Sequence, residues 1–91
     1  MSELPQAARQ AADAYAHAVV LLGRCGEATH QADWAALAEH AGALSVAAGE
    51  LSVAAGAVTR EETPVSPAEF HAAAQQAIRG RQPDPRVPRG Q

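Results

Sequence analysis

The sequence predicts an all-α protein, and two observations lead to this prediction. The first is the segment Leu44–Val58, LSVAAGELSVAAGAV, in which one heptad is repeated almost unchanged. Its apolar residues recur every three or four positions, as in a helix that packs along its length on another helix. The second is that strand-like alternation and β-branched runs are missing from the chain. We therefore expect a long antiparallel helical hairpin with a short third helix, completed as a bundle by homodimerisation.

The first helix is expected over residues 3–24. Pro5 is tolerated in a first helical turn, and Gly23 and Gly26 bracket the expected end, so that residues 27–31 form the turn. The apolar seam predicted for this helix pairs alanines with larger residues: Leu4, Ala8, Ala11, Ala12, Tyr15, Ala18, Val19 and Leu22.

The second helix is expected over residues 30–61, with Thr29 or Asp33 as its N-cap. Large residues alternate with alanines along its predicted seam, and this alternation predicts helix axes closer together than the usual spacing of about 8–10 Å. The seam is Trp34, Leu37, Ala41, Leu44, Ala48, Leu51, Ala55 and Val58.

A second apolar row follows the opposite side of the same helix. We call it the glycine–valine face, and it consists of Gly42, Val46, Gly49, Val53 and Gly56. Each glycine in a helix interior costs about 1 kcal/mol relative to alanine, so three of them at heptad spacing call for a compensating contact. We expect this face to be the interface of a homodimer. The alternative explanation of the glycines is that GC-rich coding has enriched the helix in small residues, without any interface.

The third helix is expected over residues 67–79, because two prolines at 64 and 67 interrupt the second helix. Ser66, Pro67 and Glu69 form a capping box, and Gly80 is expected to end the helix. Its apolar face contains Phe70, Ala73, Ala74, Ala77 and Ile78. Residues 1–80 are thus the predicted domain. Residues 81–91 are expected to be a proline- and arginine-rich tail that is extended or disordered. The alternative is that this tail docks on an acidic surface.

The charge distribution argues against a nucleic-acid partner. Residues 1–78 carry three arginines against nine carboxylates, a balance of −6, and the basic residues gather after position 78. Nucleic-acid binding needs its cations on the folded part. The single cysteine, Cys25, excludes an internal disulfide and favours a cytoplasmic location. Uninterrupted apolar runs such as 18–23 are too short to cross a bilayer, so no membrane partner is expected.

Histidines and carboxylates suggest one alternative, a metal- or small-ligand-binding bundle. If the hairpin turns near residue 28, His17 comes level with Glu39 and His40, and Asp13 lies one turn from His17. Such a set could hold zinc or iron, although Asp13 and His17 also fit an ordinary solvated i, i+4 pair. Glu27 and His30 have the spacing of a ferritin-like ligand pair but fall in the predicted turn.

The sequence contains no phosphate-binding loop, nucleophile elbow or zincin motif. No catalytic residue and no cofactor is therefore predicted. The sequence favours a non-enzymatic helical interaction module that binds a second copy of itself and scaffolds or regulates another protein.

Overall fold

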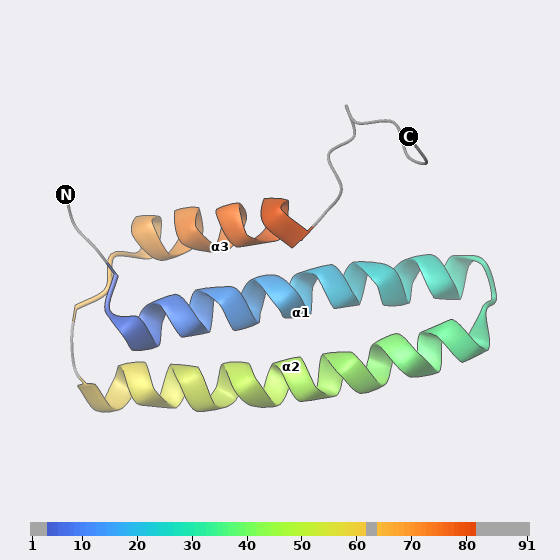
Figure 1. Ribbon diagram of the computed structural model, residues 1–91, viewed down its shortest axis with the longest axis horizontal. Helices are drawn as coiled ribbons and strands as arrows, with labels where there is room; N and C mark the ends of the chain where they lie inside the picture. Colours follow the sequence, from blue (N-terminus) through green and yellow to red (C-terminus); the bar gives the residue numbers. More distant parts are fainter. Residues whose placement is uncertain (1–3, 62–63, 82–91) are drawn as a thin grey trace.

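The computed structural model describes residues 4–61 and 64–81. These residues form three helices, α1 (Gln6–His30), α2 (Trp34–Glu61) and α3 (Pro67–Arg81). Helices α1 and α2 pack against each other as a long antiparallel hairpin, and α3 packs on α1 (Figure 1). Among the described residues α2 and α3 make no contact, so α1 is the middle helix. The predicted all-α class and the hairpin are confirmed.

Helix α1 continues past both glycines that were expected to end it. It begins after Pro5, whose carbonyl accepts the N–H of Arg9 at 2.9 Å, and ends at His30 rather than at residue 24. Gly23 and Gly26 are exposed, and a Cβ at either would meet no described atom within 4 Å. A glycine lowers helix propensity by about 1 kcal/mol, which the long contact of α1 with α2 can offset.

The hairpin turn is built by residues 31–33 and has the hydrogen bonds of a Schellman motif. The N–H of Ala32 donates to the Thr29 carbonyl at 3.0 Å, and the N–H of Asp33 donates to the Ala28 carbonyl at 2.8 Å. Ala32 has a φ of 55°, the left-handed conformation that such a turn requires. Because Thr29 lies inside α1, where its hydroxyl donates to the Cys25 carbonyl, it is not the cap of α2.

Asp33 caps helix α2. Its Oδ1 accepts the N–H of Ala36 at 3.1 Å, and its carbonyl accepts the N–H of Leu37 at 3.0 Å. The predicted start at residue 30 is therefore wrong, whereas the predicted end at residue 61 is confirmed. The helix passes through Gly42, Gly49 and Gly56 without a break.

The side of α2 that packs on α1 contains the predicted leucines but not the predicted alanines. Ala47 and Ala54 are buried beside half-buried leucines, while Ala41, Ala48 and Ala55 are exposed. Trp34, also placed in the seam, is 65% exposed. The repeat contains two adjacent alanines, 47–48 and 54–55, and either member of each pair fits a heptad with the leucines. The contact with α1 selects the first member.

Helix α1 packs on α2 on one side and on α3 on another, so its buried residues cover more of its surface than a single seam. Its buried residues are mostly alanines: Ala7, Ala8, Ala11, Ala12, Ala16, Val20, Leu21, Cys25 and Ala28. Two of the larger residues predicted for its seam are exposed, Tyr15 at 40% and Leu22 at 62%. Small side chains therefore fill the middle of the protein, and some of the larger ones lie at its edges.

Helix α3 runs along the first half of α1 in the same direction (Figure 1). Ser66 caps it, with its Oγ accepting the N–H of Glu69 at 3.4 Å. Ala74 is fully buried, and the other four residues of the predicted apolar face are half-buried. The helix passes through Gly80 to Arg81, so the predicted end at residue 79 is wrong. The rest of the predicted tail, residues 82–91, lies outside the described residues.

Candidate functional site

The candidate site is the glycine–valine face of α2, the outer face of this helix, which is distinct from the alanines and leucines that pack on α1. Val46 is 64% exposed and Val53 is 71% exposed. Gly42 and Gly49 are also exposed, and beyond the adjacent residues and local helix backbone a Cβ at either would meet no described atom within 4 Å. Among the described residues no other helix lies against the glycine–valine face, and no contact with them offsets the low helix propensity of Gly42 and Gly49.

The C-terminal end of this face carries a positive charge. Gly56 is half-buried, and a Cβ built on it would lie 3.4 Å from Nη1 of Arg60. The guanidinium group of Arg60 thus reaches back over the last glycine of the face. Glu39, three residues before Gly42, is exposed near the other end.

Helix α2 is apolar around most of its circumference, yet little of it is covered. By length and composition it could cross a membrane, and 11% of its most apolar 18-residue window is buried. Uninterrupted apolar runs in the sequence do not reveal this property, because single serines and Glu50 interrupt α2 without making it polar overall. A helix left so uncovered exposes apolar surface, and large exposed apolar patches mark sites of protein–protein or membrane interaction.

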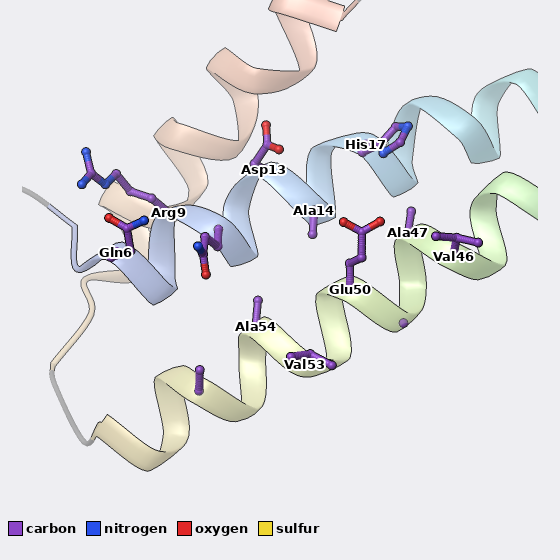
Figure 2. A pocket seen from close by; sticks show the side chains of 13 residues that line it. Gln6, Arg9, Asp13, Ala14, His17, Val46, Ala47, Glu50, Val53 and Ala54 are labelled. Carbon is purple, nitrogen blue, oxygen red and sulfur yellow. The ribbon is translucent and has the colours of Figure 1, made fainter.

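A groove of about 860 Å³ runs between α1 and α2 and extends this surface. Three residues of the glycine–valine face, Val46, Gly49 and Val53, lie on its α2 wall, and polar side chains dominate its α1 wall (Figure 2). Glu50 extends from α2 toward α1, on the groove side of the helix (Figure 2). The α1 wall consists of Gln6, Arg9, Gln10, Asp13, Ala14 and His17.

The residues predicted for a metal site are not brought together. The hairpin turns at 31–33 rather than near residue 28, a difference of about four residues. The residue of α2 that lies opposite a given residue of α1 therefore shifts by about eight positions, or ~12 Å along the helix. His17 consequently lines the groove with Ala47 and Glu50, instead of facing Glu39 and His40. Among the described residues no three histidine, cysteine or carboxylate side chains are grouped so that they could hold a metal ion.

Asp13 has a different partner, which sequence reasoning missed. Nη2 of Arg81 donates to both of its carboxylate oxygens at 2.9 Å, so this ion pair ties the end of α3 to α1. The two residues are 68 positions apart, and their meeting depends on how α3 docks. No local pattern in the sequence could have indicated it.

The remaining candidates lie apart from the outer face of α2. Glu27 and His30 are exposed in the last turn of α1, and Cys25 is buried in the same helix. None of the three lines the groove or the glycine–valine face.

The geometry thus directs attention to one uncovered apolar helix face rather than to a cluster of reactive groups. Comparison with protein-family models, with curated proteins and with solved structures finds no match to this chain.

Proposed function

We propose that this protein is a non-enzymatic interaction module that self-associates through the glycine–valine face of α2 and, once assembled, scaffolds or regulates a protein partner. The observation that carries the proposal is the exposure of Val46 and Val53, at 64% and 71%, on a long and largely apolar helix. Fully burying a valine stabilises an assembly by roughly 1.5–3 kcal/mol, and a dimer would bury four of them.

The composition of the core supports a second copy of the chain as the partner that covers the glycine–valine face. The buried residues of the described chain are nine alanines with Val20, Leu21 and Cys25, and no large side chain among them is completely buried. A chain of 91 residues has room for a modest core, and alanine contributes little apolar area to it. Symmetric association is the commonest way for a small chain to extend its core.

The glycines support close contact between two helices. At Gly42 and Gly49 nothing projects from the outer face beyond the backbone, so another helix can approach closely while the valines fill the spaces beside it. The contacts made by such an approach would offset the helix propensity that the glycines sacrifice.

Gly49→Leu tests this proposal. In the single chain the new side chain meets open space and improves helix propensity by somewhat less than ~1 kcal/mol, so the monomer should be as stable as before or more so. In the dimer it would separate the two helices, at a cost of about 1–3 kcal/mol from overpacking. We expect a Kd raised about 5- to 150-fold in sedimentation velocity experiments.

Ala48→Leu is the matched control, because Ala48 is an exposed neighbour that lies off the glycine–valine face. It adds the same bulk to α2 and should leave the Kd within about two-fold of the parent, a change below ~0.5 kcal/mol. The proposal fails if Gly49→Leu associates as well as its parent. It also fails if the two variants weaken association equally.

A further inference from the structure

We infer that the second copy docks antiparallel along α2, with the two-fold axis passing between residues 49 and 50, and that Arg60 of each copy pairs with Glu39 of the other. This inference rests on the proposed self-association and adds its direction, its register and the charged residues that set them.

The glycine–valine face is nearly symmetric about its own centre. Gly42 and Gly56 lie seven residues before and after Gly49, and Val46 and Val53 lie three before and four after it. An antiparallel partner in this register therefore sets Val46 beside Val53 of the second copy, and each glycine lies within one residue, or ~1.5 Å along the helix axis, of a glycine of the second copy. One surface can then fit a second copy of itself, as a two-fold interface requires.

The charges at the two ends of the face favour the antiparallel direction. Glu39 lies ten residues before Gly49 and Arg60 lies eleven after it, so the axis that pairs the valines also brings Arg60 level with Glu39 of the second copy, twice. Arg60 already reaches over Gly56 at the edge of the contact. In a parallel pair, Glu39 would face Glu39 and Arg60 would face Arg60, and both contacts would repel.

Neither Glu39 nor Arg60 is paired with another residue in the part of the chain that the structure describes. Arg81 pairs with Asp13, and no hydrogen bond or ion pair joins Glu39 or Arg60 to a described residue. Exposed ion pairs contribute little to affinity. The valines therefore provide most of the binding free energy, and the ion pairs determine that the two helices dock antiparallel.

Glu50 is the acidic residue nearest to the proposed axis, and its orientation is compatible with it. Figure 2 shows its side chain extending toward α1 on the side of the groove rather than outward from α2. Two such carboxylates would each point toward their own α1 helix. The central contact is thereby left to Gly49 and the two valines.

Cysteine cross-linking tests the arrangement. In a Cys25→Ala background, one chain carries Glu39→Cys and a second carries Arg60→Cys, and the two are mixed and oxidised under mild conditions. In the antiparallel register these positions come together. Two copies of position 39 would lie about 30 Å apart by helix rise, far beyond the roughly 4.4–6.8 Å between Cα atoms that a disulfide allows.

We expect the mixed disulfide to form at least about ten-fold faster than either self-linked product, a ratio equivalent to ~1.4 kcal/mol. Arg24→Cys, on the exposed side of α1, gives the rate of chance collisions. Self-linked products above that rate, without the mixed one, would overturn the antiparallel register while leaving self-association intact. A wild-type chain that sediments as a monomer would overturn both the antiparallel register and self-association. If that monomer also bound phosphatidylcholine vesicles, the glycine–valine face would be a lipid-binding surface.

Discussion

At the scale of single residues, the turn between the long helices shows how the fold tolerates a local mismatch. The Schellman motif at 31–33 needs a left-handed residue at its centre, and this position holds Ala32, with a φ of 55°. A left-handed alanine costs roughly 1–2 kcal/mol, because its Cβ crowds the following carbonyl oxygen. The left-handed conformation at residue 32 turns the chain so that Asp33, the next residue, can cap α2.

Ala32→Gly should therefore stabilise the protein. Glycine removes the crowded Cβ but raises the entropy of the unfolded chain, so we expect a net gain of about 0.5–1 kcal/mol in the free energy of unfolding. Urea denaturation monitored by circular dichroism measures it. Ala48→Gly, at an exposed site inside α2, should instead cost about 1 kcal/mol. Equal destabilisation by both changes would mean that the left-handed turn is not the conformation in solution.

Asp33 and Thr29 illustrate what the residue level could and could not predict. Both are good N-caps by type, and the sequence left the choice between them open. The choice depends on where α1 ends, and that end depends on contacts between the helices. The four-residue error in the turn position then moved His17 away from Glu39 and His40, which removed the geometric basis of the predicted metal site.

At the scale of the helices, periodicity predicted the number, type and order of the elements. It placed the leucines of α2 against α1 correctly, but it could not choose between adjacent alanines that fit the same heptad, such as Ala47 and Ala48. The seam of α1 was predicted too narrow, and Tyr15 and Leu22 were placed inside it although both are exposed. A helix that is packed on two sides does not display one amphipathic stripe.

Gly23→Ala and Gly26→Ala test whether α1 is continuous through its last two turns. Both glycines are exposed with open space around the Cβ position, so alanine adds helix propensity without a clash. Each change should stabilise the protein by about 0.5–1 kcal/mol in urea denaturation. If α1 instead ended near residue 24, with Gly26 in a left-handed conformation, Gly26→Ala would be destabilising.

At the scale of the whole molecule, the order of packing is α3, α1, α2, with α2 on the outside. The sequence did not show that α3 packs on α1, because all three helices carry alanine-rich faces and α3 could have covered the glycine–valine face. Its position leaves that face free. The described helices thus form one layer with α2 at its edge. In the proposed dimer, a second copy joined through α2 would place both apolar helices in the centre.

The proposed assembly is a dimer, so its most direct test is the mass of the protein in solution. Sedimentation equilibrium of the wild-type chain, from low to high micromolar concentration, should give twice the chain mass of 9.4 kDa at the upper end and dissociation on dilution. A species of 9.4 kDa at every concentration would contradict the account, because α2 would then have to remain stable with its valines in water.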